Sequence, residues 1–409
     1  MKVYLVGGAV RDQLLGFAIK ERDWVVIGET PNAMEAQGFK AVGKDFPVFL
    51  HPKTHEEYAL ARTERKTAPG YRGFSINASP NVTLEQDLLR RDLTINAIAQ
   101  DDAGTLIDPF GGQKDLGLRL LRHISSAFTE DPVRILRVAR FMARYHHLGF
   151  KVSEETMTLM KNMVDKGEID ALVPERVWSE LAKTLSEQTP TQFFDVLQNC
   201  GALAKLFPEI HRLFGVPQPA KYHPEIDTGI HTMMVLEQAV KLSDDPRVRF
   251  AALTHDLGKG MTPKEQWPGH RGHEKTGLTA LEGFCKRLRV PNEYKKLAQK
   301  VIRFHGNCHR IFELRSSTMV DTLQSLDAFR KNESLTPFLL TCIADARGRK
   351  GLESIPYPQA DFFLRVQRAA LSVDVSPLIE QGLEGSAIGL KLRELRIRAV
   401  EMCKKETTT

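Results

Sequence analysis

The distribution of apolar residues changes character once along the chain. Up to about residue 108, short apolar runs between turn residues predict strands at 2–6, 24–27, 48–50, 58–62 and 105–107, with a helix at 9–15. After Gly111 and Gly112 such runs nearly disappear, and apolar residues recur at helical spacing to the end of the chain. The pattern therefore predicts a small α/β head followed by a long, all-α body.

The helical part is interrupted once by a proline-rich segment, PQPAKYHPEID at 217–227, which is typical of a domain boundary. A chain of 409 residues is also too long for one ordinary domain. We expect four parts: a head at 1–110, a helical neck and body at 111–222, a second helical domain at 223–350 and a helical tail at 351–409.

The first candidate site lies in KVYLVGGAVRDQLLG and the following KERDWVV. Glu21 and Asp23 are two residues apart at the start of a predicted strand, so their carboxylates share a face and favour a divalent metal between them. Gly7 and Gly8 form a turn at a helix N-terminus, which suits phosphate, and Arg11 follows one turn later. The plainer alternative is a glycine turn beside two surface acids.

The second candidate motif is EDPVRILRVARF at 130–141. Arg134, Arg137 and Arg140 recur every three residues and predict an arginine stripe beside the apolar face of a helix. Pro132 suits a first helical turn, so the acid before it is expected to cap the helix. An Asp–Arg pair can bind the amino group and ring nitrogen that cytosine and adenine share, and reject uracil and guanine. The plainer alternative is a cap followed by a solvated basic face.

Three motifs occur in a fixed order: GGAVRD with its acidic pair, RRDLTINAIA at 90–99, and EDPVRILRVARF. Together they resemble the class II nucleotidyltransferases of the polymerase-β superfamily, whose members are CCA-adding tRNA nucleotidyltransferases and bacterial poly(A) polymerases. The resemblance implies a polymerase-β-like α/β nucleotidyltransferase head that uses Mg²⁺, followed by a neck for base recognition and tRNA binding.

The resemblance also implies roles for individual residues. Glu21 and Asp23 would bind Mg²⁺ and Glu57 would be a third carboxylate. The nucleotide-binding positions would be Gly8, Arg11, Arg91, Asp92, Asp131, Arg134, Arg137 and Arg140, with Asp131 and Arg134 reading the base edge of CTP or ATP. The family often has Asp at the first metal position, where this chain has Glu21, whose longer side chain can still reach a metal.

A second set of motifs follows the proline-rich segment: GIHTMM, RFAALTHDLGKG, two histidines in a glycine-containing loop, VIRFHGN and ADARGR. Histidines and carboxylates from several helices can hold a divalent metal that activates water. Their order resembles the HD phosphohydrolase domain. The resemblance implies that His231, His255, Asp256 and Asp345 are metal ligands, with His273 and His305 as further ligands or phosphate contacts.

For this HD domain, the resemblance implies phosphatase, 2′-nucleotidase and 2′,3′-cyclic phosphodiesterase activity with Ni²⁺ or another divalent transition metal, with His255 and Asp256 in catalytic roles. We expect both residues within an apolar helix that ends at Gly258. The alternative is a degenerate HD fold without activity.

The segment 63–81, TERKTAPGYRGFSINASPN, is basic, rich in Gly, Pro and Ser, and without a clear period. It predicts a long functional or mobile loop. In the resembled family, a flexible loop in this region helps the pocket change from CTP to ATP. Tyr71 and Phe74 are candidates for stacking on a base. The alternative is plain surface disorder.

Composition changes this picture little. A net charge of +6 favours a polyanionic partner without requiring one. Five scattered cysteines predict no disulfide framework and fit a reducing compartment. We find no signal peptide or apolar run of transmembrane length, and we expect a cytoplasmic protein without membrane contact, as a monomer or weak homo-oligomer.

The combined pattern favours a CCA-adding tRNA nucleotidyltransferase of the kind that carries a C-terminal HD domain. Its expected partners are CTP, ATP and the 3′ end and acceptor arm of tRNA, bound mainly through phosphates and therefore sensitive to salt. The alternatives are a poly(A) polymerase, an enzyme that adds only part of CCA, and an HD phosphohydrolase or RNA-binding scaffold with an inactive head.

Overall fold

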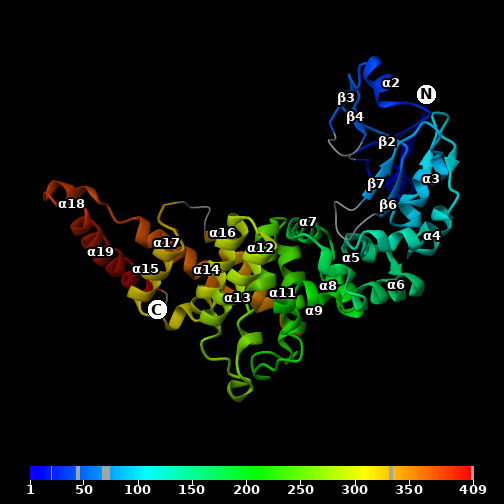
Figure 1. Cartoon of the computed structure of the whole chain (residues 1–409). Coiled ribbons are helices and arrows are strands. Elements are labelled where there is room, and N and C mark those ends of the chain that lie inside the picture. Colours follow the sequence, from blue (N-terminus) through cyan, green and yellow to red (C-terminus); the bar gives the residue numbers. More distant parts are fainter. Residues whose placement is uncertain (20, 43–46, 67–73, 331–334, 407–409) are drawn as a thin grey trace. The chain divides into compact units, whose positions relative to one another are not determined.

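The computed structural model describes residues 1–19, 21–42, 47–66, 74–330 and 335–406 (Figure 1). The chain forms two compact units, Met1–Leu206 and Phe207–Thr409, which are described separately below. Among the residues just given, none of the helices combines the length and the apolar character that crossing a bilayer requires. The five cysteines, all of which lie within these residues, form no disulfide bond.

A seven-stranded mixed sheet organises the head, in the order β3-β4-β5-β2-β1-β8-β9. The strands are β1 (Lys2–Val6), β2 (Asp23–Ile27), β3 (Lys40–Ala41), β4 (Val48–Leu50), β5 (Glu57–Leu60), β8 (Ala99–Gln100) and β9 (Leu106–Ile107). Only β2 and β5 pair in parallel; the other neighbours are antiparallel. The register places Asp23 opposite Val6 on one side and Glu57 on the other.

The central strands are held by apolar clusters that use alternate residues of β2. Val25 packs in one cluster with Val6 and Leu88, and Val26 packs in the other with Met34 and Phe49. The helices of the head are α1 (Gly8–Leu14), α2 (Pro31–Ala36) and α3 (Leu84–Leu89). Val25 and Val26 of β2 are both buried, one on each face of the sheet. This packing on both faces holds the strand, and therefore its first residues, in a fixed position.

The expectation of an aperiodic loop over 63–81 was wrong in part, because two stretches of this segment are strands. Strands β6 (Thr63–Lys66) and β7 (Phe74–Asn77) pair in antiparallel register. The strand Thr63–Lys66 was missed because it contains charged residues and no apolar pattern. Pairing with β7 satisfies its backbone N–H and C=O groups without such a pattern. Tyr71 and the side chain of Phe74 lie outside the described residues, so their proposed stacking stays a prediction.

Helices dominate the rest of the first unit, as predicted. They are α4 (Gly112–Leu118), α5 (Val133–Tyr145), α6 (Glu154–Asp165), α7 (Pro174–Leu185), α8 (Thr191–Asn199) and α9 (Ala202–Leu206), with two short parallel strands, β10 (Leu120–Leu121) and β11 (Lys151–Val152). Helix α5 packs against α7 and α8, and nearly all of its residues are buried. It is therefore a rigid support for the arginines along its length.

The second unit is helical throughout its described residues. Its helices are α10 (Pro208–His211), α11 (Thr228–Leu242), α12 (Pro246–Thr254), α13 (His273–Leu288), α14 (Asn292–His309), α15 (Ser316–Ser325), α16 (Leu335–Arg347), α17 (Pro358–Leu371), α18 (Ser376–Glu380) and α19 (Ser386–Lys405). Short 3₁₀ turns in the two units lie at Thr94–Asn96, Ser126–Glu130, His146–Leu148, Glu168–Ala171, Lys259–Met261, Lys264–Gln266 and Ile311–Glu313. Helix α12 packs against α11, α14 and α16.

One boundary in this unit differs from the prediction in a way that affects the candidate site. Helix α12 ends at Thr254, so His255 and Asp256 lie in the turn that follows it and not within an apolar helix reaching Gly258. Gly258 packs so closely on the start of α13 that a Cβ there would overlap the carbonyl oxygen of His273. This close approach brings the turn and His273 together.

Candidate functional site

A cavity of about 530 Å³ in the first unit collects most of the residues predicted for nucleotide and Mg²⁺ binding. Those that line it are Gly8, Arg11, Glu21, Asp23, Arg91, Asp92, Asp131, Arg134, Arg137 and Arg140. Gly7, Arg90, Asn96, Val133, Phe141, Arg144 and Arg176 complete the lining. We refer to this space as the head cavity. Its lining combines a pair of carboxylates with many guanidinium groups, which suits an anionic ligand that carries a divalent cation.

Glu21 and Asp23 supply the paired carboxylates. The side chain of Asp23 keeps some exposed surface. Its partial desolvation raises the pKa of its carboxyl group, the charge of Arg91 lowers this pKa, and the charge of the neighbouring Glu21 raises it. A divalent cation would relieve this repulsion. Two carboxylate donors fit Mg²⁺, which commonly takes one or two protein carboxylates and completes its shell with substrate phosphates.

Glu57 is the one predicted head residue that does not line this cavity. It lies beside Asp23 in the sheet, and together with Glu21 and Asp23 it lines a second space of about 510 Å³. The three acids therefore adjoin, although Glu57 is not among the residues that line the head cavity. Its role as a third carboxylate stays a prediction.

The glycine turn brings the backbone close to Arg91. Gly7 adopts a left-handed conformation with φ of +70°, and its N–H donates to the carbonyl of Ile98. A Cβ on Gly7 would lie 2.8 Å from Nη1 of Arg91. The left-handed backbone therefore favours glycine at this position, and a Cβ would also force the Arg91 guanidinium to shift.

A buried polar network links the floor of the cavity to α5. Oδ2 of Asp92 accepts from Nε of Arg137 at 2.7 Å, and Oδ1 accepts from Nδ2 of Asn96 at 2.8 Å. Asn96 in turn accepts from Nη1 of Arg11. Burial would raise the pKa of Asp92, but the charge of Arg137 and the hydrogen bonds outweigh it and lower the pKa. Asp92 is thus a buried anion that orients two arginines.

Removing this anion is expected to destabilise the head. Asp92→Ala leaves Asn96 and Arg137 without their acceptor, and breaking a buried ion pair costs roughly 3–5 kcal/mol. Because the folded-state pKa is depressed, the stabilisation is complete above the unfolded pKa of about 4 and is lost as the pH falls. Urea unfolding followed by tryptophan fluorescence should show both effects, whereas Asp102→Ala, at an exposed position, should change little. Equal stabilities of the two variants would contradict the role given to Asp92.

Asp131, two residues before α5, and Arg134 in the first turn of α5 both line the head cavity, and each is held by other groups. Arg176 on α7 donates two hydrogen bonds to the Asp131 carboxylate, at 2.9 and 2.7 Å. Arg134 donates to the carbonyl oxygens of Ala127 at 2.8 Å and Arg90 at 2.6 Å. The helix begins at Val133, one residue later than predicted, and its N–H donates to Asp131. Asp131 and Arg134 are therefore already oriented by the protein.

Sequence reasoning missed three arginines of this cavity, of which Arg90 is the direct neighbour of the predicted Arg91. Arg176 follows the proline that opens α7, and no local pattern connects it with Asp131, 45 residues earlier. Arg144 lies four residues beyond Arg140 on the same helix, so extending the arginine stripe by one turn would have found it.

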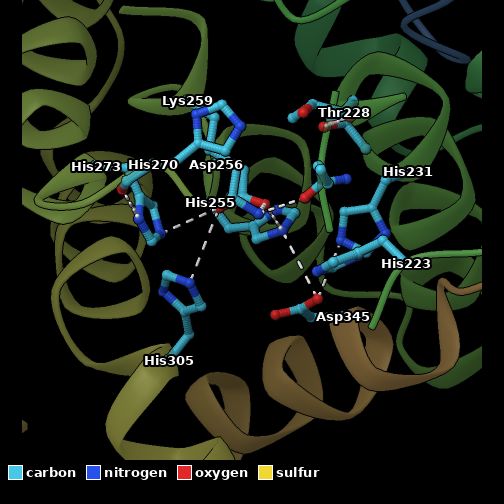
Figure 2. Close-up of polar contacts among 12 residues, drawn as sticks. His223, Thr228, His231, His255, Asp256, Lys259, His270, His273, His305 and Asp345 are labelled. Carbon is cyan, nitrogen blue, oxygen red and sulfur yellow. Dashed lines mark hydrogen bonds and ion pairs between the residues drawn. The ribbon is translucent and has the colours of Figure 1, made fainter. Parts of the chain in front are cut away.

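A second cluster of ionisable residues lies in the second unit (Figure 2). His255 and Asp256 lie at its centre, with His231 on α11 and Asp345 on α16 to one side and His273 on α13 and His305 on α14 to the other. Their ligand atoms form two groups, each within 4.8 Å: His231 with His255 and Asp345, and Asp256 with His273 and His305. A third group joins His223 and Glu225 to His231.

The hydrogen bonds of four histidines fix where their lone pairs point. Nδ1 of His231, His255, His273 and His305 lies 2.8–3.0 Å from the carbonyl oxygens of Gly348, Ala252, His270 and Val301, respectively. A carbonyl can only accept, so each Nδ1 donates, and in the neutral ring Nε2 carries the lone pair. Donation from the other ring nitrogen to a carbonyl or carboxylate is the usual arrangement for histidines that bind metals.

The centre of the cluster leaves buried polar atoms without hydrogen-bond partners. These atoms are Nε2 of His255, Oδ1 of Asp256 and Nε2 of His273. Unsatisfied buried groups of this kind are costly, and nitrogen and carboxylate donors in this combination suit a divalent transition metal. The residues present therefore fit the metal site expected of an HD domain.

Charge and burial oppose one another within this cluster. Burial lowers the pKa of His305 to about 4, which keeps the imidazole neutral. Burial also disfavours the charged form of His255, but Asp256 and Asp345 outweigh it and raise its pKa. Burial would raise the pKa of Asp345, but the surrounding histidines lower it. Burial would likewise raise the pKa of Asp256, but Lys259 and His255 lower it, so both carboxylates remain anionic.

Several neighbours of the cluster were not predicted. Nζ of Lys259 lies 2.6 Å from Oδ2 of Asp256, and its place in HDLGKG could have indicated this. Nε2 of His309 lies 2.7 Å from Oδ2 of Asp345, and its spacing of four from His305 on α14 was the available signal. His223 and Glu225 were hidden in the proline-rich segment read as a boundary. His270 contacts Thr262 and the carbonyl of Pro217 and belongs to no ligand group among the described residues.

Comparison with known families assigns the two sites to two different domains. The chain matches the "Poly A polymerase head domain" over residues 3–122, the "Probable RNA and SrmB- binding site of polymerase A" over residues 149–214, and the "HD domain" over residues 228–346. The recognised head therefore contains the paired carboxylates, and the recognised HD segment contains His231 to Asp345.

Full-length relatives and solved structures are also similar. "Multifunctional CCA protein" of Methylococcus capsulatus is 66% identical over 98% of this chain and 94% of its own, and that of Thioalkalivibrio sulfidiphilus is 61% identical over 99% of both. Structures of an apo CCA-adding enzyme and of CCA-adding enzyme with CTP and with ATP have TM-scores of 0.67, 0.64 and 0.65 at 22%, 22% and 21% identity. They cover 98–100% of this chain and 87–91% of their own, and show that the fold is shared.

Proposed function

The chain belongs to the family of multifunctional CCA proteins, and on that premise we propose that its head adds and repairs the 3′-terminal CCA of tRNA, using CTP and ATP without a nucleic-acid template. The observation that carries the proposal is the head cavity. Its lining joins paired carboxylates, a glycine turn and arginines with Asp131 and Arg134 at the start of α5. These are the parts that nucleotidyl transfer and base selection require.

In the proposed reaction, the 3′-hydroxyl of the tRNA attacks the α-phosphorus of the nucleotide. The new P–O bond joins the nucleotide to the RNA, and pyrophosphate leaves with the pair of electrons from the broken bond. Bound Mg²⁺ would lower the pKa of the attacking hydroxyl and stabilise the leaving group. Glu21 and Asp23 would hold it, while Arg11 and Arg91 would bind the triphosphate beside Gly8.

For base selection, we propose that Asp131 accepts a hydrogen bond from the exocyclic amino group of cytosine or adenine and that Arg134 donates to the adjacent ring nitrogen. Arg137 and Arg140 would support this pair. Asp92 would position Arg137 through the contact at 2.7 Å, and Glu180 would position Arg140 through a contact at 2.6 Å. Protein groups would thus replace a template strand.

The bidentate contact from Arg176 is expected to be needed for base selection. Arg176→Ala frees the Asp131 carboxylate to rotate, so we expect kcat/KM for CTP and ATP to fall by about tenfold, equivalent to about 1.4 kcal/mol, with more UTP incorporated. Arg176→Lys keeps the charge but loses the paired geometry, and should be intermediate. Steady-state incorporation with each nucleotide measures this. A rise in activity in Arg176→Ala would show instead that Arg176 competes with the base for Asp131.

For the second site, we propose a metal-dependent phosphohydrolase with phosphatase, 2′-nucleotidase and 2′,3′-cyclic phosphodiesterase activities. The supporting observation is the set of imidazoles whose Nε2 atoms face two buried carboxylates. Ni²⁺ or another divalent transition metal would supply an activated water. Lys259, beside Asp256, would bind the phosphate of the substrate. Removing a terminal phosphate would free the hydroxyl that the head extends.

One assay tests the head function against its alternatives. The protein is incubated with Mg²⁺ and a tRNA that lacks its last three nucleotides, with CTP and ATP supplied singly and together, and the product is sequenced. CCA addition predicts two cytidines with CTP alone and a complete CCA with both. Long adenosine tails would indicate a poly(A) polymerase, incomplete products would indicate a partial CCA-adding enzyme, and no product would indicate an inactive head.

A further inference from the structure

A third space in the first unit adjoins the head cavity and has no role in the functions described so far. Its volume is about 740 Å³, and Arg140 and Arg144 line both spaces. Phe17, His147 and Lys183 are among its other lining residues, and Glu187 is its one acidic group. We refer to this space as the neck cavity. Its charge is predominantly positive, which suits a phosphate-bearing ligand.

An exposed aromatic ring stands at the wall of the neck cavity. The side chain of Phe17 is 37% exposed, and its ring stacks on Tyr145 with centroids 6.3 Å apart. Tyr145 stacks in turn on Phe141 at 6.1 Å with an interplanar angle of 5°. Because Phe141 lines the head cavity, this row of rings connects the two cavities through the protein interior.

The cations of the neck cavity differ in availability. Arg140 is buried and donates to Glu180 at 2.6 Å, so its charge is largely compensated. Arg144 contacts Asp12 at 2.9 Å but keeps about a third of its side chain exposed. Lys183 and His147 are exposed. A phosphate-bearing ligand would therefore be attracted mainly by Arg144, Lys183 and His147.

We propose that the neck cavity binds an unpaired nucleotide at the 3′ end of the tRNA, with the base stacked on Phe17 and the phosphate beside Arg144 and Lys183. This inference rests on the proposed CCA addition by the head. An exposed ring beside cations is the general means by which proteins hold single-stranded nucleic acid, and stacking accepts any base. An RNA end in this cavity would lie next to the arginines shared with the head cavity, where the next nucleotide is expected.

A free nucleoside triphosphate shares the chemistry of a base with phosphate, so the test must separate it from an RNA end. The probes are a hairpin RNA copying the acceptor arm with one unpaired 3′ nucleotide, the same hairpin without it, and CTP. Dissociation constants are measured with the full chain in the absence of Mg²⁺, so the result does not depend on catalysis. CCA addition by the wild type is measured separately, and its absence would refute the proposed function without deciding the binding result.

The variants are Phe17→Ala, Phe17→Trp and Lys183→Gln, with Leu14→Ala as the matched control, because Leu14 is also exposed near the end of α1 but does not line the cavity. We expect Phe17→Ala to weaken binding of the extended hairpin by about tenfold, the order expected for one stacked base, and Phe17→Trp to retain it. Lys183→Gln should reduce the salt dependence by about one counterion. Binding of the hairpin without the extra nucleotide, and binding of CTP, should change less than twofold.

Two results would overturn the proposal. If Phe17→Ala weakens both hairpins equally, or neither, the cavity does not recognise the unpaired nucleotide. If binding of CTP falls while binding of the extended hairpin is unchanged, the cavity holds a free nucleotide instead.

Discussion

Replacing Asp23 by Asn is expected to reduce nucleotide incorporation by about a thousandfold or more. The substitution keeps the size of the side chain and the pairing of β2, but it removes one of the two carboxylates at the wall of the head cavity. A catalytic metal contributes several kcal/mol to transition-state stabilisation, and each 1.4 kcal/mol is about tenfold in rate. Single-turnover incorporation of radiolabelled CTP into a tRNA that lacks CCA measures the loss.

Two controls separate this effect from misfolding. Glu35→Gln changes an exposed acid on α2 in the same unit, and it should retain full incorporation. The phosphohydrolase activity proposed for the second unit should be unaffected in Asp23→Asn. If Asp23→Asn incorporates CTP within tenfold of the wild type, Asp23 does not hold the catalytic metal.

The residues that could be predicted are those whose position is set by their spacing from close neighbours in the sequence. The i, i+2 spacing of Glu21 and Asp23 placed both acids at one cavity, and the three-residue spacing on α5 placed its arginines along the same cavity. A helix fixes such relations by its own repeat, so they can be read without knowing the tertiary structure. Glu21 precedes β2, and its closeness to Asp23 in the sequence is enough to bring both to the cavity. The strands at 2–6 and 48–50 were predicted for the same reason.

Contacts between distant segments could not be predicted in this way. The bond from Arg176 to Asp131 joins two helices, and the bond from His309 to Asp345 also joins two helices. Each depends on how helices pack, which spacing along one helix does not encode. His255 and Asp256 were placed in a helix because the preceding residues are apolar, whereas close packing at Gly258 turns the chain after Thr254. The prediction named residues that the structure brings together, but it missed the turn that presents His255 and Asp256.

Replacing His255 by Ala is expected to abolish the phosphohydrolase activity and leave CCA addition intact. His255 is buried, its Nδ1 bonds the carbonyl of Ala252 at 2.8 Å, and its unpartnered Nε2 faces Asp256 and Asp345. Loss of an orienting neighbour already lowers metal affinity by roughly 10–100-fold, and loss of a ligand should cost at least about 100-fold. Metal content after dialysis against Ni²⁺, and hydrolysis of a 2′,3′-cyclic nucleotide, measure the two effects.

Two further variants, His309→Phe and His211→Ala, test whether the loss of metal binding depends on the arrangement of the site. His309 contacts Asp345 at 2.7 Å and Tyr357 at 2.7 Å, so its loss should weaken metal binding by about 10-fold through the freed carboxylate rather than abolish it. His211 is exposed on α10 and should have no effect. The expected order of metal affinity is therefore wild type and His211→Ala, then His309→Phe, then His255→Ala. Loss of CCA addition together with hydrolysis in His255→Ala would refute separable sites, and hydrolysis that survives without bound metal would refute the metal-dependent mechanism.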